Sequence, residues 1–204
     1  MLTLLGTGTA VFLENILDRA AASMRSVIDE NPDKYEDVSD EERDHMARQL
    51  GLAAVVVQDL SARRIKDYTF DWARMTDARG DTGVYLQYAH ARLMGIQRSF
   101  GRPLPHVDSV DLSSLARSED AFRLAVQVSL FPEVVETALE RTEPSMLVHY
   151  LFDLGHAMSS ANAVLRVKDQ APAVAEPRMM LFAAARIALA NGLKLLGLVP
   201  LDRV

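Results

Sequence analysis

Apolar residues recur at every third or fourth position along most of this chain, which is the spacing of an amphipathic helix. The clearest early series is Leu13, Ile16, Leu17, Ala20, Met24, Val27 and Ile28. It predicts a helix over residues 13–30. The same spacing later in the chain predicts five more helices, at about 82–99, 118–130, 132–142, 144–168 and 177–197.

The segment after the first helix has a different pattern. The letters SDEE, beginning at Ser39, place a capping side chain before acidic first-turn residues, so a helix is expected from there to about Gln49. Gly51 stands where a left-handed helix end favours glycine. The next run, LAAVVVQDL (52–60), is short and rich in β-branched residues, which predicts a strand. Weak alternation in DYTFDW (67–72) predicts another extended segment.

Prolines and one long connection mark the remaining boundaries. Pro132 and Pro144 each stand where a first helical turn tolerates proline. Pro172 and Pro177 are expected to break the chain before the last helix. Residues 101–117 contain two prolines and no clear periodicity, so we expect an exposed loop that braces the helices.

The predicted fold class is therefore all-α. We expect a bundle of about five helices over 82–204, preceded by a short mixed α/β connecting segment over 1–75. Apolar residues make up 49% of the chain and charged residues 25%, which suits a protein with a buried core. No run approaches the roughly 18 apolar residues of a membrane span, so no membrane partner is expected. The start, MLTLLGTGTAVFL, lacks the basic region of a signal peptide.

Charge narrows the search for a partner. The net charge of -6 argues against indiscriminate nucleic-acid binding. Its distribution is uneven, because residues 61–100 carry seven basic and four acidic side chains and residues 145–204 carry six basic and four acidic ones. An anionic partner should be sought on these two segments, although such swings are also common on solvated surfaces.

Motifs for catalysis are absent from the sequence. There is no G-x-x-x-x-G-K-[ST] loop and no G-x-G-x-x-G fingerprint, and Gly6-Thr7-Gly8 is more simply a turn than an anion site. The chain has no cysteine, and its five histidines lack metal-ligand spacing, so no metal site is predicted. His149 and His156 are expected to pack or cap. No serine nucleophile elbow occurs either, and we predict no catalytic residue.

The helix over 82–99 carries more chemistry than its core requires. At about 100° per residue, its apolar side chains and Tyr85 fall within one arc of a core stripe. Tyr88, Arg92, Gly95 and Ser99 share the adjoining sector, where the two small residues would let another backbone approach. An aromatic ring beside an arginine can stack an unpaired base and hold its phosphate. Alternatively, Tyr88 packs at the core margin with its hydroxyl hydrogen-bonded.

The stretch LSARRIKDYTFDWARMTDARGDTGVYLQYAHARL closely resembles the arginyl-tRNA synthetases. Their pattern of arginine, aspartate, tyrosine and Phe-Asp-Trp, then a Gly-Asn/Asp-Thr turn and a Tyr-x-Gln-Tyr-Ala-x-x-Arg helix, is matched in order. The matching residues are Arg64, Asp67, Tyr68, Phe70, Asp71, Trp72, Gly80, Asp81, Thr82, Tyr85, Gln87, Tyr88, Ala89 and Arg92.

Two further stretches extend the resemblance over nearly the whole chain. HYLFDLGHAMSSANAVLRV and LFAAARIALANGLKLLGLVPLDRV are similar to the end of the eukaryotic-type enzymes, the helical DALR-type anticodon-binding domain. AVFLENILDRA resembles the segment after the signature loop of the catalytic domain. The resemblance implies the tail of a catalytic domain over 1–75 and a helical anticodon-binding domain over 76–204.

The resemblance also implies that the family's catalytic site is missing from this chain. Family members are several times longer and use a His-x-Gly-His motif and a basic signature loop to handle ATP. The first motif is absent, and TLLGTGT (3–9) stands at the place of the second with Gly6 and Thr7 instead of basic residues. Adenylate formation requires ATP phosphates to be positioned and neutralised. We therefore expect a truncated chain that holds no cofactor and does not charge tRNA alone.

Other departures concern RNA contacts. Relatives commonly place a phenylalanine and a glutamate at Ala78 and Arg79, and the final methionine of the family corresponds to Val204. On the late helix, a tyrosine and a tryptophan are replaced by Asn162 and Arg166. Losing two stacking rings lowers affinity by a few kcal/mol at roughly 1–3 kcal/mol each, part of which Arg166 could recover. The candidate tRNA-binding residues are Tyr85, Tyr88, Arg92, Asn162 and Arg166.

Three functions remain open from the sequence. In the first, the chain binds the anticodon stem-loop of arginine tRNA and contributes to aminoacylation within a full-length arginine–tRNA ligase. In the second, it is a degenerate synthetase-derived fragment that acts as a protein-interaction module, as the lost aromatics and the acidic first sixty residues suggest. In the third, a separate chain supplies the catalytic half in trans. The family favours a cytoplasmic location, with the mitochondrion as the alternative.

Overall fold

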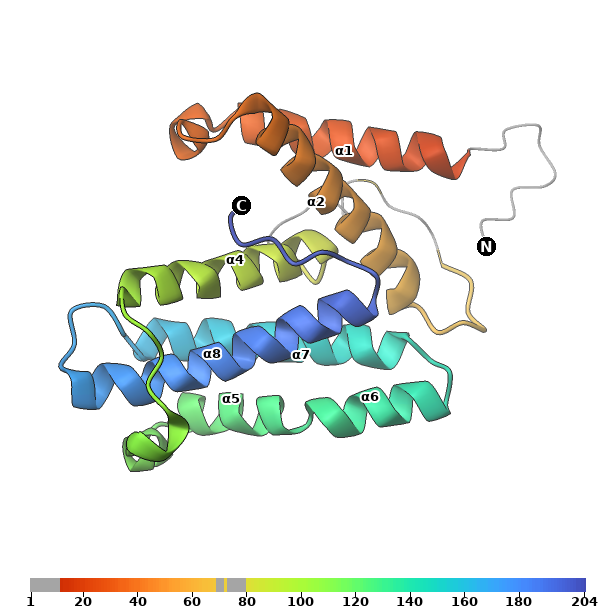
Figure 1. The fold of residues 1–204 in the computed structure, drawn as a ribbon. Coiled ribbons are helices and arrows are strands. Elements are labelled where there is room, and N and C mark those ends of the chain that lie inside the picture. The colour runs from red at the N-terminus through yellow and green to blue at the C-terminus, as the bar shows by residue number, and fades with distance from the viewer. Residues whose placement is uncertain (1–11, 69–71, 73–79) are drawn as a thin grey trace.

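The computed structural model describes residues 12–68, 72 and 80–204, and within them the regular elements are all helices. Figure 1 shows a helical hairpin lying across one side of a helical bundle. In chain order the elements are α1 (Leu13–Asp29), η1 (Pro32–Tyr35), α2 (Asp40–Ser61), α4 (Gly83–Phe100), η2 (Val107–Ser109), η3 (Ser113–Arg117), α5 (Glu119–Ser129), α6 (Phe131–Glu140), α7 (Ser145–Val164) and α8 (Pro172–Leu195). The predicted all-α fold is confirmed.

The hairpin of α1 and α2 is held by close packing and by charge. Ile16, Ala20, Met24 and Ile28 form the buried stripe of α1, at the spacing that the sequence predicts. Arg25 pairs across the hairpin with Asp40 and Asp44, and along its own helix with Asp29. The predicted cap at Ser39 is present as a capping box with Glu42. It satisfies two backbone groups that would otherwise lack a partner at the start of α2.

The predicted strand over 52–60 is wrong, because α2 continues without a break to Ser61. Gly51 does not end the helix but lies inside it, where a Cβ would come 2.6 Å from the backbone nitrogen of Ala21. The β-branched residues of this run are helical because packing against neighbouring helices outweighs their modest intrinsic preference. Of the extended segment predicted over 67–72, residues 69–71 lie outside the described part, and Asp67, Tyr68 and Trp72 are not in a strand.

The bundle is built around α7. This helix has buried side chains along its length, and its neighbours are α2, α4, α5, α6 and α8. In Figure 1, α4 lies between the hairpin and the pair α7 and α8, while α5 and α6 form the layer farthest from α1. The buried residues form two clusters, one inside the bundle and one between the hairpin, α4 and the end of the chain.

Helix boundaries in the second half differ from the prediction at the end of α7, which is Val164 and not residue 168, and at the start of α8. Helix α8 begins at Pro172, so this proline occupies the first turn, and Pro177 lies buried inside the helix. Neither proline breaks the chain at the place expected. Gly192 continues the helix and packs tightly, since a Cβ there would lie 2.4 Å from Leu151 Cδ2. The predicted loop over 101–117 holds the two short 3₁₀ turns η2 and η3.

After α8 the chain turns back at Gly197, whose φ of 78° is in the left-handed region that favours glycine. Residues 198–204, called here the C-terminal tail, then run along α4 toward η1 (Figure 1). Leu201 and Val204 of the tail are buried in the second cluster. Among the described residues, none of the helices combines the length and the apolar character that a membrane crossing requires.

Candidate nucleic-acid interface

Helix α4 starts at a well-defined cap that sets the direction of its side chains. Thr82 precedes the helix, and its Oγ1 accepts a hydrogen bond of 3.1 Å from the backbone nitrogen of Tyr85. Gly83 lies against α2 so closely that a Cβ there would come 1.9 Å from the carbonyl oxygen of Ala53. The cap and this contact fix the rotation of α4 about its own axis, and with it the positions of Tyr85, Tyr88 and Arg92.

Tyr85 is half-buried between α4 and α7. Its hydroxyl lies 3.3 Å from Ser159 Oγ, and its ring centre lies 5.7 Å from that of His156. The ring packs over Gly155, where a Cβ would approach Tyr85 Cε1 to 2.9 Å. Burial raises the pKa of the Tyr85 hydroxyl above its ordinary value, and the charge of Arg92 opposes that rise. The ring is therefore used for packing, as its place in the apolar arc of the helix predicts, and its neutral hydroxyl end lies near Arg92.

Tyr88 lies in the second cluster, next to η1. The Nζ of Lys34 lies 4.9 Å from the centre of its ring, within the range of a cation–π contact. Beneath it, Tyr35 is fully buried, and burial together with the hydroxyl of Tyr88 raises the pKa of Tyr35, against the charge of Arg203. Tyr88 is partly buried at the margin of this cluster and its hydroxyl is hydrogen-bonded to that of Tyr35, which is the packing that the alternative interpretation of Tyr88 predicts. Part of its side chain stays exposed beside Lys34.

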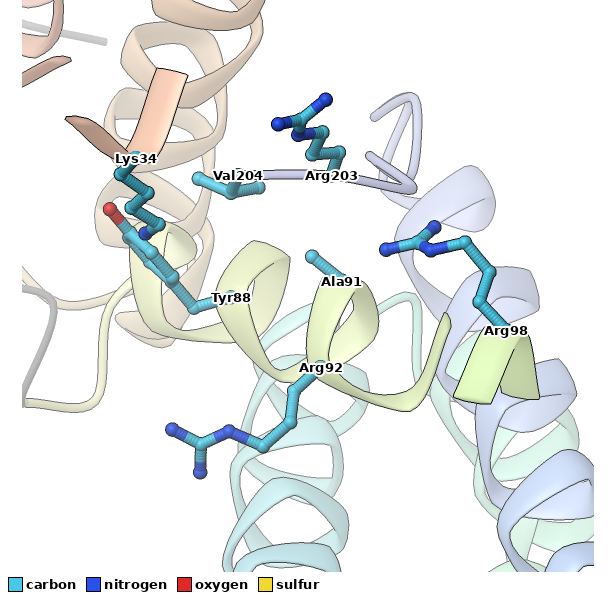
Figure 2. A pocket seen from close by; sticks show the side chains of 7 residues that line it. All are labelled: Lys34, Tyr88, Ala91, Arg92, Arg98, Arg203 and Val204. Carbon is cyan, nitrogen blue, oxygen red and sulfur yellow. The ribbon is translucent and has the colours of Figure 1, made fainter. Parts of the chain in front are cut away.

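These residues open onto a basic pocket. Its volume is about 280 Å³, and its lining residues are Lys34, Tyr88, Ala91, Arg92, Arg98, Arg203 and Val204. Figure 2 shows Lys34 beside Tyr88 and Arg203 on the tail above α4, while Arg92 extends away from Arg203. The lining has four cationic side chains and no carboxylate side chain. Such a concentration of one charge attracts anions, most strongly at low salt.

The C-terminal tail completes the pocket and is held to α4 by polar side chains. Gln87 is fully buried, and both ends of its amide are used: Nε2 donates to the carbonyl of Val199 at 2.9 Å, and Oε1 accepts from the backbone nitrogen of Leu201 at 2.9 Å. His90 lies 2.8 Å through Nδ1 from the carbonyl oxygen of Leu201. Arg98 donates to the carbonyl of Asp202 at 3.0 Å.

The remaining two candidates, Asn162 and Arg166, lie at the end of α7 and do not line the pocket. Asn162 is partly buried, one helical turn beyond Ser159. Arg166 has an exposed side chain just past the helix, and its carbonyl accepts a hydrogen bond of 2.7 Å from Arg178 Nη1. The structure thus joins Tyr88 and Arg92 in one pocket, with Tyr85 adjoining, and leaves Asn162 and Arg166 on a neighbouring surface.

Sequence reasoning missed three of the four cations of the pocket and misjudged Gly95 of α4, which does not line it. Lys34, Arg98 and Arg203 were not among the candidates, because they come from three segments whose convergence no helical period reveals. The positive balance of 61–100 and 145–204 was the available signal for the two arginines. Gly95 was expected to admit another backbone, but a Cβ there would meet only Arg98 Nη2, at 4.0 Å.

Comparison with known proteins assigns both halves of the chain. Residues 86–204 match the family model of the DALR anticodon binding domain, which covers more than half of the chain. Residues 4–72 match the catalytic domain of class I (R) tRNA synthetases. This chain belongs to the arginyl-tRNA synthetase family. The resemblance drawn from the sequence is therefore confirmed, and the described helices of the second half are those of a synthetase anticodon-binding domain.

Related proteins show how much of a synthetase is covered. "Probable arginine--tRNA ligase, cytoplasmic" of Dictyostelium discoideum is 46% identical over 197 residues, which are 97% of this chain and 33% of that protein. "Arginine--tRNA ligase, cytoplasmic" of Saccharomyces cerevisiae is 40% identical, over 97% of this chain and 32% of its own length. The chain spans about a third of the length of these synthetases.

A solved structure agrees with the family. The arginyl-tRNA synthetase of Thermus thermophilus superposes with a TM-score of 0.83 at 26% identity, over 97% of this chain and 33% of that one. The superposition includes the hairpin of α1 and α2 as well as the bundle, because it extends over nearly the whole chain. The family fold is thus present from α1 to the C-terminal tail.

Proposed function

We propose that the basic pocket on α4 binds the anticodon stem-loop of arginine tRNA and that this chain serves as the tRNA-binding region of an arginine–tRNA ligase. The observation that carries the proposal is the lining of the pocket, in which one partly exposed aromatic ring is joined by four cationic side chains and no acidic side chain. The DALR family model over 86–204 supports an anticodon as the ligand.

The chemistry of the lining suits single-stranded RNA. In the proposal an unpaired base stacks on the exposed part of the Tyr88 ring, since stacking on aromatic rings is the usual way that proteins hold loop nucleotides. Lys34 lies beside that ring, and Arg98 and Arg203 line the rest of the pocket, where the proposal has them supply charge for the neighbouring phosphates. In the proposal Arg92 contacts the phosphate backbone of the RNA where it passes between Tyr88 and Tyr85. Tyr85 contributes only its hydroxyl end.

Asn162 and Arg166 extend the proposed surface along the end of α7. Arg166 is exposed and positively charged, so it can contact a phosphate or the face of a base. Asn162 can donate and accept hydrogen bonds at a base edge. In the proposal the RNA loop contacts α7 as well as α4.

In this proposal the chain contributes RNA binding to aminoacylation and does not activate arginine itself. The sequence contains no His-x-Gly-His motif, and the residues at the place of the signature loop, 3–9, lie outside the described part. ATP therefore belongs to the full-length enzyme. We place the boundary between the catalytic tail and the anticodon-binding domain at 75 and 76, and the compartment as the cytoplasm, since both first relatives are named as cytoplasmic enzymes.

Filter binding tests the proposal directly. The chain should bind the arginine tRNA more tightly than an unrelated tRNA of equal length, at matched salt because phosphate contacts depend on it. An isolated anticodon stem-loop should compete, and an acceptor-stem duplex should not. Equal affinity for both tRNAs would reject the proposal.

A protein partner is a second candidate, favoured by two apolar surfaces. Phe12 and Leu13 at the start of α1 are 72% and 61% exposed, which suits a catalytic half supplied in trans. An apolar groove of about 640 Å³ between α6 and α8, bordered by Leu139 and Leu195, suits a protein-interaction module. Co-expression with a catalytic half and an aminoacylation assay tests the first. A pull-down from lysate that is protected from nucleases, if it recovers protein partners but no RNA, would favour the protein-interaction module.

A further inference from the structure

Gln87 and His90 are the buried polar residues of α4, and both are directed at the C-terminal tail. Gln87 has 0% of its surface exposed and His90 has 2%. Burying an amide or an imidazole is unfavourable unless its polar atoms are paired. Here the pairing partners are the backbone groups of Val199 and Leu201, more than one hundred residues away in the sequence.

The two hydrogen bonds of Gln87 define the register of the tail. The amide donates to the carbonyl of Val199 and accepts from the nitrogen of Leu201, which is the pairing that a neighbouring strand would offer. A shift of the tail by one residue would break both bonds. His90 fixes the same point from the other side, because a carbonyl oxygen only accepts and Nδ1 must therefore donate to Leu201.

Register matters because the last residues of the tail line the pocket. Arg203 and Val204 follow Leu201 by two and three residues and stand opposite Tyr88 and Lys34. Without the tail, the pocket would lose one of its four cations and one apolar wall.

We infer that Gln87 and His90 are positioning residues, which hold the C-terminal tail in register on α4 and thereby set the RNA-binding shape of the pocket. The part that concerns RNA rests on the proposed function. The part that concerns the tail rests on geometry alone, so the two can be tested separately.

A thiol reporter measures the tail. Since the chain has no cysteine, Leu201→Cys supplies a single buried thiol whose rate of labelling reports opening of the tail. Adding Gln87→Met leaves two buried backbone groups unpaired, which should speed labelling at least about tenfold. The matched control carries the thiol in the bundle instead, as Met179→Cys, and there Gln87→Met should leave the labelling rate unchanged.

Histidine variants separate positioning from general packing. His90→Leu removes the donor to Leu201 and should speed labelling at position 201. His90→Asn places an amide nitrogen near the position of Nδ1 and should restore slow labelling. The inference is overturned if the thiol at position 201 is labelled no faster with Gln87→Met or His90→Leu added than in the Leu201→Cys parent. It is also overturned if the two changes speed the labelling of the thiol at position 179 by the same factor.

RNA binding tests the consequence for the pocket. With the anticodon stem-loop of arginine tRNA as the probe, Gln87→Met should weaken binding at least about tenfold. Deleting residues 199–204 should weaken it similarly, and the combined variant no further, because both changes remove the same contact. Additive losses, or an open tail with unchanged affinity, would refute the link to the pocket. If the parent chain binds no RNA, the proposed function fails while the labelling rates still decide whether the tail is positioned.

Discussion

The ammonium group of Lys34 lies 4.9 Å from the ring centre of Tyr88. Lys34 belongs to η1, between the two helices of the hairpin, and Tyr88 belongs to α4 of the bundle. Desolvation lowers the pKa of Lys34, as expected for an amine held against a ring and a buried neighbour. The pocket is thus an assembly of hairpin, bundle and tail, and its chemistry depends on all three segments being in place.

Replacing Tyr88 should separate stacking from hydrogen bonding. Tyr88→Phe keeps the ring and should bind the anticodon stem-loop nearly as well as the parent. Tyr88→Ala removes the ring and should weaken binding by about 1–3 kcal/mol, the range for a base stacked on an aromatic side chain. Fluorescence anisotropy at fixed salt measures both. Equal losses for the two variants would instead assign the contact to the hydroxyl.

The salt dependence of binding should report the cations of the pocket. Arg203→Gln removes one phosphate contact and should reduce the slope of log K against log salt by about 0.7, the value for a single strand. Arg141→Gln serves as the matched control, because Arg141 is exposed at the end of α6 and does not line the pocket. A slope that changes as much in the control would mean that the charge acts nonspecifically.

The contact between α2 and α4 predicts a stability difference between two glycines of the same helix. A Cβ at Gly83 would lie 1.9 Å from the carbonyl oxygen of Ala53, so Gly83→Ala must push the helices apart. The free energy of unfolding should fall by about 1–3 kcal/mol or more. At Gly95 the nearest atom to an added Cβ is the mobile end of Arg98, at 4.0 Å. Gly95→Ala should therefore raise the free energy of unfolding by up to about 1 kcal/mol.

Urea denaturation of the parent and the two alanine variants measures this difference. Helix propensity alone would stabilise both variants, because alanine is the better helix former at either position. Opposite signs at positions 83 and 95 are therefore the result that depends on the close contact, and a stabilised Gly83→Ala would contradict it.

His90 predicts a loss of stability in mild acid. Burial lowers the pKa of His90 below its ordinary 6.5, assisted by the charges of Arg186 and Lys194 and opposed by the carbonyl of Leu201 and by Asp202. Its Nε2 is buried without a hydrogen-bond partner among the described residues, so a second proton there would be poorly accommodated. The unfolded chain takes up the proton near pH 6.5 and the folded chain does so only at lower pH.

The sign follows from linkage. Neutral His90 makes its full contribution to the free energy of unfolding above pH 6.5, and this contribution is lost as the pH falls through the lowered pKa of the folded state. Uptake of one proton lowers the free energy of unfolding by at most about 1.4 kcal/mol per pH unit. Thermal unfolding between about pH 8 and pH 5 should show a smaller decline in His90→Asn than in the parent. Parallel declines would assign the acid sensitivity to other groups.

The helices of the bundle could be predicted from the sequence because apolar residues recur in them at helical spacing, although α7 ends at Val164 and not at 168 and α8 begins at Pro172 and not at 177. Helix α4 was placed within one residue at each end, and its cap at Thr82 follows from the Gly-Asp-Thr turn. The run 52–60 was misjudged because its β-branched letters are the same in a strand and in a helix packed on both sides. Only the contacts of Gly51 with α1 and of Ala53 with α4 decide between them.

The candidate site was predictable only in part, for a related reason. Tyr88 and Arg92 share a face of one helix, and a period of 3.6 residues places them together. Gln87 and His90 fall on the remaining face, which helical geometry alone assigns to solvent. What covers that face is a tail from the other end of the chain, and contacts at such sequence separation leave no local pattern.

The main chain of α2 packs directly against the main chains of two other helices. Gly51 lies against α1, and Ala53 lies against Gly83 of α4. Side chains in ordinary interfaces can change rotamer and absorb a small displacement, but main chains in direct contact leave no such compliance. Helix α2 therefore holds α1 and α4 at a fixed spacing, and this spacing keeps Lys34 of η1 beside the ring of Tyr88.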